Sequence, residues 1–417
     1  MQVFKFGGAS IKNPDAVKNM SEIIRKYKHN PLLIIVSAMG KTTNALEKIT
    51  EAYVHKKDFQ HELGQLKTFH LDMATGLFPK GHEVMIKIDQ LFELLAENLN
   101  GNSSYDQLYD QVVSTGELLS STIISAYLNQ VGISTTWLDA RDFIKTDDHC
   151  RQANVDWDKT GRLVTASIPS ILAQSVVLTQ GYIASAENGI TTTLGREGSD
   201  FSAAVFASLL DAESVTVWKD VPGILNADPK LIKDAELFTE LPYKEAAEMT
   251  YYGASVIHPK TIRPLANKNI PLHVKSFYQY DEPGTIIHQC EINERLPVIM
   301  VKKNQCLLSF KVMDYSFVNE DNLSVIFKEL AKADLRISIM QNSAISFSIA
   351  LDNDLGKVEN VIENLRHEFN ILYNTGLQLI TIKNYSQSLI DKYRNDRKIL
   401  LEQISRSNYR ALVAPGE

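Results

Sequence analysis

Residues 2–10 read Gln-Val-Phe-Lys-Phe-Gly-Gly-Ala-Ser, a short β-favouring run that carries a lysine near its end and stops at two glycines. A helix is predicted after it, because Asn13 can cap a first turn and Pro14 suits the first helical position. Leu32–Val36 then forms a continuous apolar run with the length of a buried strand. Short apolar strands that alternate with helices are typical of a parallel sheet covered on both faces.

Two further apolar runs extend this α/β pattern along the chain. Ser175–Leu178 and Ser214–Trp218 each have the composition of a buried strand and stand beside helix-like segments. Residues 55–112 read as mostly helical. We therefore predict one α/β domain over residues 1–285, with a mostly parallel sheet sandwiched by helices.

The pattern changes after Asp281–Gly284. Residues 305–374 predict a βαββαβ unit of ferredoxin-like type, in which Ile345–Leu351 alternates apolar and polar side chains as a half-buried antiparallel strand does. Residues 295–304 and 375–417 supply the strands and one helix of a second, shortened unit that lacks its last helix. We expect two intertwined, small α+β units.

The composition is that of a globular, acidic protein. The 417 residues contain 43 Lys and Arg against 50 Asp and Glu, which gives a formal net charge of −7, and 44% of them are hydrophobic. This length accommodates about two to four domains. Because an excess of negative charge supplies no long-range attraction for nucleic acid or anionic lipid, neither is an expected partner.

Cysteine spacing and hydropathy indicate the cellular compartment in which the protein is expected. Cys150, Cys290 and Cys306 show no paired spacing, which indicates neither a disulfide framework nor a zinc site, so the sequence predicts no metal-ligand set. Apolar runs such as Leu32–Val36 fall far short of the ~18 residues that span a bilayer. The first residues read as a strand rather than as a targeting segment. These features predict a cytoplasmic protein.

The lysine and glycines of residues 2–10 are suited to binding a phosphate. Gly7 and Gly8 let the backbone approach an anion closely, and Lys5 can neutralise a phosphoryl group during its transfer. The segment matches neither a Walker loop nor a GxGxxG fingerprint. An ordinary link between a strand and a helix is the alternative interpretation.

Three other segments carry polar residues near predicted helix starts or strand ends. In Gly195–Asp200, Arg196 can bind a carboxylate, and an acidic residue can bind an ammonium group. A surface loop with a capping Asp is the alternative interpretation of the same residues. Glu117 stands at the start of a predicted apolar helix, where a favourable charge near the helix dipole is the simpler role. The loop from Lys219 to Lys230 is open to two interpretations, a nucleotide-binding loop or a structural turn.

Taken together, these segments closely resemble the aspartate kinases of the amino-acid kinase superfamily. The resemblance covers essentially the whole chain and rests on Lys5–Ser10, Ser37–Asn44, Ser114–Glu117, Gly195–Asp200, Lys219–Asp228 and Tyr252–Pro259. It implies a kinase domain over residues 1–285, followed by two intertwined ACT units. It also implies transfer of the ATP γ-phosphoryl group to the side-chain carboxylate of L-aspartate, giving 4-phospho-L-aspartate. That step opens lysine, threonine and methionine biosynthesis.

The resemblance assigns roles to the residues that match the family's motifs. Lys5 and Asp200 would be catalytic, with Asp200 orienting other groups rather than removing a proton. The aspartate substrate would be surrounded by Ser37, Thr43, Glu117, Arg196 and Ser199. ATP would contact Lys5, Gly7, Gly8, Ser10, Lys219, Asp220, Asp228 and Lys230, and its Mg²⁺ would be carried by the phosphates rather than by dedicated protein ligands.

Three residues depart from the family's usual pattern. Ala9 stands where a threonine is usual, Lys219 where a threonine is frequent, and Ser255 where a lysine often reaches the nucleotide phosphates. These departures bear on nucleotide affinity more than on the reaction.

The ACT resemblance implies an amino-acid effector, lysine and/or threonine, that binds between paired units through Met313, Gln341 and Asn342. Asp321 replaces a frequent glycine, and Ala344 replaces a glutamate found in lysine-sensitive members. The alternative is that these units only mediate contacts between subunits. Because exposed sheet edges are normally covered, we expect a homodimer or a larger assembly.

Three other functions fit parts of the sequence: a kinase for glutamate or N-acetylglutamate, a catalytically silent amino-acid sensor, and a dinucleotide-dependent oxidoreductase. The ACT units and the residues of Gly195–Asp200 disfavour the first. The second is opposed by the retention of Lys5, Glu117, Arg196 and Asp200. The third lacks a Rossmann fingerprint. A carboxylate nucleophile is already ionised at pH 7, so phosphorylation of aspartate requires no general base.

Overall fold

The computed structural model describes residues 1–27, 29–101, 103–229, 232, 234–253, 257–291, 296–313, 316–395 and 397–414. The chain forms two compact units. The first comprises Met1–Ile224, Leu237–Ala247 and Ser255–Ile292, and the second comprises Leu225–Glu236, Glu248–Ala254 and Asn293–Glu417. The bounds expected from the sequence, 1–285 and the two ACT segments, stay a prediction. No helix within the described residues is long and apolar enough to cross a membrane.

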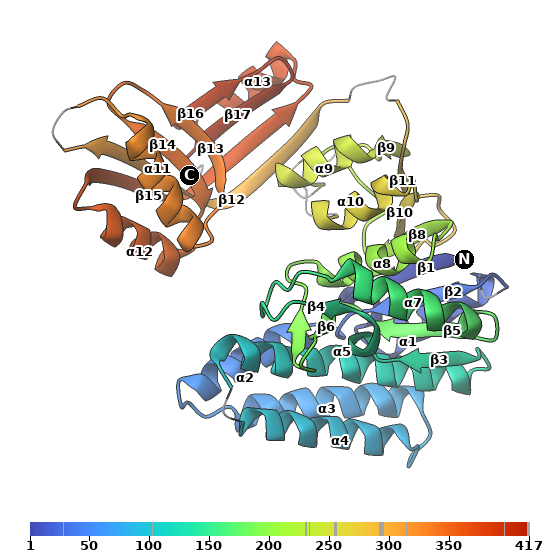
Figure 1. The fold of residues 1–417 in the computed structure, drawn as a ribbon. Helices are drawn as coiled ribbons and strands as arrows, with labels where there is room; N and C mark the ends of the chain where they lie inside the picture. Colours follow the sequence, from blue (N-terminus) through green and yellow to red (C-terminus); the bar gives the residue numbers. More distant parts are fainter. Residues whose placement is uncertain are drawn as a thin grey trace. The chain divides into compact units, whose positions relative to one another are not determined.

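The first unit is built on a mostly parallel sheet (Figure 1). Within the described residues it has eight strands, in the spatial order β3 (Thr135–Leu138), β5 (Val176–Gln180), β2 (Leu32–Val36), β1 (Gln2–Phe6), β8 (Ser214–Lys219), β10 (Leu272–Ser276), β11 (Thr285–His288) and β9 (Glu240–Pro242). All neighbours pair in parallel except β10 and β11, which are antiparallel. The strands predicted near residues 2–6, 32–36, 175–178 and 214–218 are confirmed.

Helices cover both faces of this sheet. The helical elements of the first unit are η1 (Gly8–Ile11), α1 (Pro14–Tyr27), α2 (Thr42–Val54), α3 (Gln60–Leu77), α4 (Val84–Leu99), α5 (Tyr105–Gln130), α6 (Ala140–Phe143), α7 (Trp157–Leu172), α8 (Gly198–Leu209), α9 (Tyr243–Tyr251, which continues into the second unit) and α10 (Pro259–Asn267). A small sheet orders β4 (Lys145–Thr146), β6 (Ile183–Ala186) and β7 (Thr191–Thr193). The mostly helical character of residues 55–112 is confirmed.

The alternation of side chains along β1 decides where its lysine points. Phe4 and Phe6 face the core formed with α1 and α5, and each ring lies against the indole of Trp218, at centroid distances of 5.6 Å and 6.1 Å. Because successive side chains of a strand point to opposite faces, Lys5 emerges on the other face, against which α8 packs. The core therefore fixes the direction of Lys5.

The predicted start of α1 is confirmed. The Asn13 Oδ1 atom accepts a hydrogen bond from the amide of Ala16 at 2.9 Å, and the helix begins at Pro14. Gly8 begins the short η1 turn rather than an α-helix, so the glycine pair lies in a tight turn.

The predicted helix start near Glu117 is wrong. Helix α5 begins at Tyr105, where the Ser104 hydroxyl accepts a hydrogen bond from the amide of Gln107 at 3.4 Å, and it runs for 26 residues. Glu117 lies near the middle of this helix, too far from its N-terminus for the dipole role proposed from the sequence.

The second unit is an antiparallel sheet with helices, as predicted. Within the described residues the sheet has the order β13 (Ile337–Asn342), β14 (Phe347–Asp352), β12 (Val298–Val312), β15 (Phe369–Lys383), β17 (Asn408–Val413) and β16 (Ile399–Ile404). Its helices are α11 (Glu320–Lys332), α12 (Leu355–Leu365) and α13 (Gln387–Arg394). Strands β12 and β15 each run continuously through what the sequence divides between two units, and irregular register near Gln305 marks the junction.

Gly181 sets how closely α8 approaches the sheet. A Cβ atom at this position would lie 2.5 Å from the Ser199 Cβ atom and 2.6 Å from the Ser199 Cα atom. Gly181→Ala is therefore expected to destabilise the protein by ~1–3 kcal/mol through overpacking, measured by urea denaturation. Gly64→Ala is the matched control, because Gly64 is an exposed residue of α3 and a Cβ atom added there meets no heavy atom within 4 Å. It should stabilise the protein by ~1 kcal/mol; equal effects of the two variants would contradict this packing.

Candidate active site

Loops that follow neighbouring parallel strands meet at one edge of the large sheet. The loop after β1 is tied to the loop after β2, because the Ser37 amide donates to the Phe6 carbonyl at 3.1 Å and the Gly40 amide donates to the Gly8 carbonyl at 3.0 Å. Strand β8 ends beside them with Lys219. Ligands of open α/β sheets bind at this carboxyl edge, so this is where a site is expected.

A buried cluster of charges lies at this edge. The Lys5 Nζ atom is 2.7 Å from the Asp200 Oδ1 atom, and the Lys219 Nζ atom is 3.5 Å from the Asp200 Oδ2 atom. The Asp200 side chain is only 2% exposed. Burial alone would raise the pKa of Asp200, but the charges of Lys5 and Lys219 outweigh it and hold that pKa below its ordinary value. The cluster holds two ammonium groups around one carboxylate and is net positive, which suits an anionic ligand.

A side chain would not fit at Gly8, and at Gly7 it would crowd the Lys5 ammonium. A Cβ atom on Gly8 would lie 2.6 Å from the Ala38 carbonyl oxygen, and one on Gly7 would lie 3.3 Å from the Lys5 Nζ atom. The bare backbone of Gly7 therefore leaves space beside the lysine ammonium. A phosphate group fits such a space, since it accepts hydrogen bonds from backbone amides as well as from the lysine.

Glu117 is a buried carboxyl group beside the loop after β2. Its Oε1 atom accepts a hydrogen bond from the Ala38 amide at 3.4 Å, and its Oε2 atom has no hydrogen-bond partner among the described residues. Burial raises the pKa of Glu117 to about 8, and the Ala38 amide offsets this only in part. The group is therefore mostly protonated at neutral pH, and a nearby cation would favour its ionised form.

The segment before α8 brings further polar groups to the cluster. Arg196 is exposed, Ser199 is buried in the first turn of α8, and Glu197 precedes the helix with a left-handed φ of 54°. Burial raises the pKa of Glu197, and the charge of Lys219 opposes that shift. Glu197 lies within a segment that the sequence singled out, but its side chain was not predicted to take part. No signal in the sequence distinguishes it from an exposed loop residue.

Other predicted site residues lie in different surroundings. Ser10 is buried, and its hydroxyl donates to the Trp218 carbonyl at 3.2 Å, so it joins η1 to the end of β8. Ser37 and Thr43 are half-buried, the latter in the first turn of α2. Asp220 is exposed directly after β8.

The remaining predicted residues do not belong to the described part of the first unit. Asp228 lies in the second unit. Lys230 and Ser255 lie outside the described residues. The predicted effector residues are also in the second unit, where Gln341 and Asn342 end β13 and Met313 follows β12; all three are exposed.

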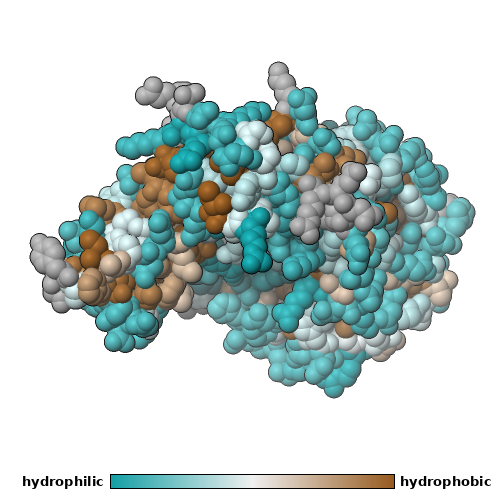
Figure 2. Space-filling model, turned by 90° about the horizontal axis from the view of Figure 1, so that it is seen from above, coloured by the Kyte–Doolittle hydropathy of each residue, from teal (hydrophilic) through white to brown (hydrophobic). Residues whose placement is uncertain are grey.

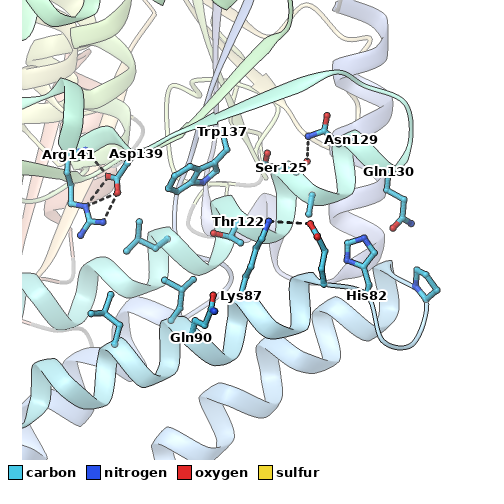
Figure 3. A pocket seen from close by; sticks show the side chains of 16 residues that line it. His82, Lys87, Gln90, Thr122, Ser125, Asn129, Gln130, Trp137, Asp139 and Arg141 are labelled. Atoms are coloured by element: carbon cyan, nitrogen blue, oxygen red, sulfur yellow. Dashed lines mark hydrogen bonds and ion pairs between the residues drawn. The ribbon is translucent and has the colours of Figure 1, made fainter.

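A large cavity of about 1060 Å³ lies elsewhere in the first unit, between α4, α5 and β3 (Figure 3). Trp137 turns its indole ring toward this cavity, and Lys87 and Arg141 stand near it, each paired with a neighbouring acid. None of the predicted site residues lines it. The charge cluster around Asp200, rather than this cavity, is therefore the candidate active site.

Comparison with known proteins identifies the family to which the chain belongs. A family model described as the amino acid kinase family matches residues 1–276. The lysine-sensitive aspartokinase 3 of Escherichia coli is 31% identical over 357 residues, which are 84% of this chain and 78% of that protein.

Two solved structures of Escherichia coli aspartokinase III are also similar. The complex with aspartate and ADP has a TM-score of 0.86 at 27% sequence identity and covers 99% of this chain and 96% of that chain. The complex with lysine and aspartate has a TM-score of 0.81 at 27% identity, over 100% and 96% of the two chains. With its family-model match, its aspartokinase relatives and its fold, the chain belongs to the amino acid kinase family and, within it, to the aspartokinases.

Proposed function

We propose that this protein is an aspartate kinase, which transfers the γ-phosphoryl group of ATP to the side-chain carboxylate of L-aspartate and forms 4-phospho-L-aspartate. The observation that carries the proposal is the buried cluster of Lys5, Asp200 and Lys219 beside the Gly7–Gly8 turn. The protein would catalyse the first step of lysine, threonine and methionine biosynthesis, in the cytoplasm.

The main obstacle to this reaction is electrostatic. The nucleophile is a carboxylate that is already ionised at neutral pH, so no base has to remove a proton. An anion must instead approach a polyanion, and catalysis consists of positioning and charge neutralisation. Lys5 is placed for this role because its ammonium lies beside the open backbone of Gly7. Asp200 holds Lys5 by an ion pair and acts as a positioning residue.

Lys219 adds a second positive charge. Its ammonium contacts the Asp200 Oδ2 atom, whereas that of Lys5 contacts Oδ1. The family often supplies such a charge from the position of Ser255, so Lys219 would compensate for its loss. Mg²⁺ bound to the ATP phosphates would neutralise further charge, and Mg²⁺ normally keeps phosphate and water ligands rather than a full protein cage.

The two ends of aspartate would be recognised by groups of opposite charge. The guanidinium of Arg196 is exposed before α8 and suits a bidentate bond to the α-carboxylate. The Glu117 Oε2 atom, buried without a partner among the described residues, would accept the α-ammonium group. Ser37, Thr43 and Ser199 would add hydroxyl contacts.

The second unit would regulate the enzyme. The relative solved with lysine and aspartate supports lysine as the effector, and Gln341 and Asn342 present exposed side chains at the end of β13. Apolar side chains are exposed on the same unit, including Phe317 at 72% and Met340 at 50%. Figure 2 shows such apolar surface gathered among hydrophilic residues. We propose that a homodimer or larger assembly covers part of it.

Lys5→Ala is expected to abolish most of the activity. The substitution removes the ammonium that neutralises the phosphoryl group, and the expected loss of kcat is on the order of 10²–10³-fold. The assay traps acyl phosphate with hydroxylamine after Mg²⁺ and ATP are added to L-aspartate, L-glutamate or N-acetylglutamate.

Lys18→Ala, on the half-exposed surface of α1, is the matched control and should keep full activity. Hydroxamate from L-aspartate alone, lost in Lys5→Ala, is the expected result. If wild-type protein binds aspartate but gives no hydroxamate with any acceptor, the protein is a silent sensor and the proposal is wrong.

Glu117→Gln is expected to change how stability depends on pH. Because the pKa of Glu117 is raised to about 8, the folded protein keeps a proton that the unfolded chain loses above its ordinary pKa near 4.5. The wild-type free energy of unfolding therefore contains a contribution that declines as pH rises from about 4.5 through 8. The neutral amide lacks this contribution, so the variant gains stability relative to wild type between pH 5 and 9 in urea denaturation without aspartate.

Glu93→Gln, on the exposed surface of α4, is the control and should show a constant difference from wild type. A constant difference for Glu117→Gln as well would mean that Glu117 is ionised in the empty site.

Lysine at millimolar concentration is expected to inhibit turnover, and Gln341→Ala to weaken that inhibition. Gln387→Ala, exposed on α13, is the control that should leave it unchanged. The same samples should show at least a dimer by light scattering. No effect of lysine or threonine, alone or combined, would leave the second unit without a regulatory role.

A further inference from the structure

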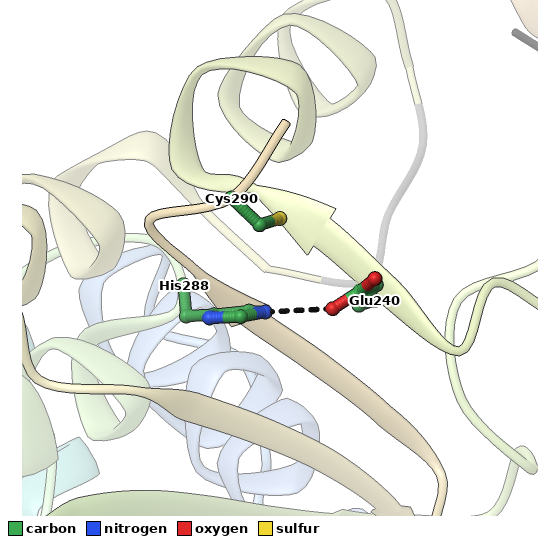
Figure 4. A group of neighbouring side chains, drawn as sticks. All are labelled: Glu240, His288 and Cys290. Atoms are coloured by element: carbon green, nitrogen blue, oxygen red, sulfur yellow. Dashed lines mark hydrogen bonds and ion pairs between the residues drawn. The ribbon is translucent and has the colours of Figure 1, made fainter. Parts of the chain in front are cut away.

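Three potential metal ligands converge at the edge of the large sheet, away from the charge cluster. Glu240 begins the edge strand β9, His288 ends β11, and Cys290 follows two residues later (Figure 4). One ligand atom from each lies within 4.8 Å of the other two. Figure 4 shows His288 and Glu240 directed toward each other, with the Cys290 side chain beside them.

The register of the two strands explains why the three side chains meet. Strands β9 and β11 run in parallel, with Ile286 opposite Glu240 and His288 opposite Pro242. Because alternate residues of a strand share a face, Glu240 and His288 lie on the same face of the sheet. Cys290 follows the end of β11, and its sulfur lies within 4.8 Å of a ligand atom of each of the other two residues.

One hydrogen bond accounts for only part of this arrangement. The His288 Nε2 atom and the Glu240 Oε2 atom are 3.0 Å apart, so a neutral imidazole protonated at Nε2 can donate a hydrogen bond to the carboxylate. This bond leaves the direction of the Cys290 thiol unexplained. Without a cation, a neutral thiol could donate only a weak hydrogen bond to the carboxylate, and an ionised thiol would repel it.

We propose that Glu240, His288 and Cys290 form a binding site for Zn²⁺. Carboxylate oxygen, imidazole nitrogen and thiolate sulfur are the three ligand types that zinc takes in proteins. Their charges, one carboxylate and one thiolate, balance those of the dication.

The three ligand atoms need to move only a short distance to coordinate one zinc ion. Zinc is held ~2.0–2.3 Å from such ligands, which places tetrahedral ligand atoms roughly 3.3–3.7 Å apart. The atoms here lie within 4.8 Å of one another, so rotation of exposed side chains can bring them together. The Glu240 side chain is 59% exposed and that of His288 is 34% exposed, which leaves an open route for the ion and a fourth position for water.

Binding would exchange protons in a defined way. The thiol of Cys290 gives its proton to solvent as the sulfur–zinc bond forms. The imidazole of His288 moves its proton from Nε2 to Nδ1, which frees Nε2 for the metal. The Glu240 carboxylate exchanges its hydrogen bond for a metal bond. One proton is released for each zinc ion.

The ion would stabilise the pairing of the edge strand β9 with β11. Strand β9 has three residues and is joined to the sheet by its pairing with β11. A metal bridge from Glu240 to His288 and Cys290 would hold β9 against β11 beyond what this short ladder provides. Ions that bind the folded state alone raise its stability.

The test uses the full-length chain, stripped of metal with a chelator and kept reduced with a phosphine. Co²⁺ is added as a spectroscopic substitute for Zn²⁺. We expect one equivalent to bind, with a thiolate-to-cobalt charge-transfer band that zinc then removes, and a higher melting temperature in the presence of zinc.

Cys290→Ser should lose the band and the rise in melting temperature, and His288→Gln and Glu240→Gln should lose the one-equivalent stoichiometry. Cys150→Ser is the matched control, since Cys150 is another partly exposed thiol of this chain, and it should bind as wild type does. Absence of the band in wild-type protein, or its persistence in Cys290→Ser, would overturn the proposal. Neither result bears on the kinase reaction, because these residues lie outside the Asp200 cluster.

Discussion

The buried ion pair between Lys5 and Asp200 is the interaction on which the arrangement of the site depends. Removing a charge from water is costly unless a partner compensates for it, so Asp200 can be buried at the start of α8 only because Lys5 and Lys219 contact it. The pair in turn requires Lys5 to point toward α8. The aromatic packing of Phe4 and Phe6 against Trp218 on the other face imposes that direction.

Around this pair, the lysine ammonium groups and the protonated carboxyl group of Glu117 lie beside different loops. The Lys5 ammonium lies beside Gly7, whereas Glu117 lies beside the loop after β2, where burial keeps its carboxyl group mostly protonated. The two loops are joined by hydrogen bonds of the Ser37 and Gly40 amides, and the Ser120 hydroxyl of α5 donates to the Ser37 carbonyl at 2.7 Å. One backbone network therefore positions the proposed phosphate and ammonium contacts together.

Much of the fold was predictable because it rests on local patterns. The cap at Asn13 and the apolar runs of β2, β5 and β8 are visible in short windows of sequence. The start of α5 is mispredicted because Ser114-Thr115-Gly116 resembles a cap, whereas the helix begins at Tyr105 and its buried residues run through this segment from Leu108. The role of Lys219 in the cluster and the meeting of Glu240 with His288, 48 residues apart, depend on strand register, which no local pattern encodes.

In the proposed mechanism, Asp200 acts through Lys5, the lysine that it positions. A double-mutant cycle on kcat tests this claim most directly, with Lys5→Met, Asp200→Asn and the double variant assayed at saturating ATP and aspartate. If Asp200 works by holding Lys5, the double variant should have the same kcat as Lys5→Met alone, because Asp200 no longer has an ammonium group to position. Losses that multiply would contradict the account and assign Asp200 an independent role in the reaction.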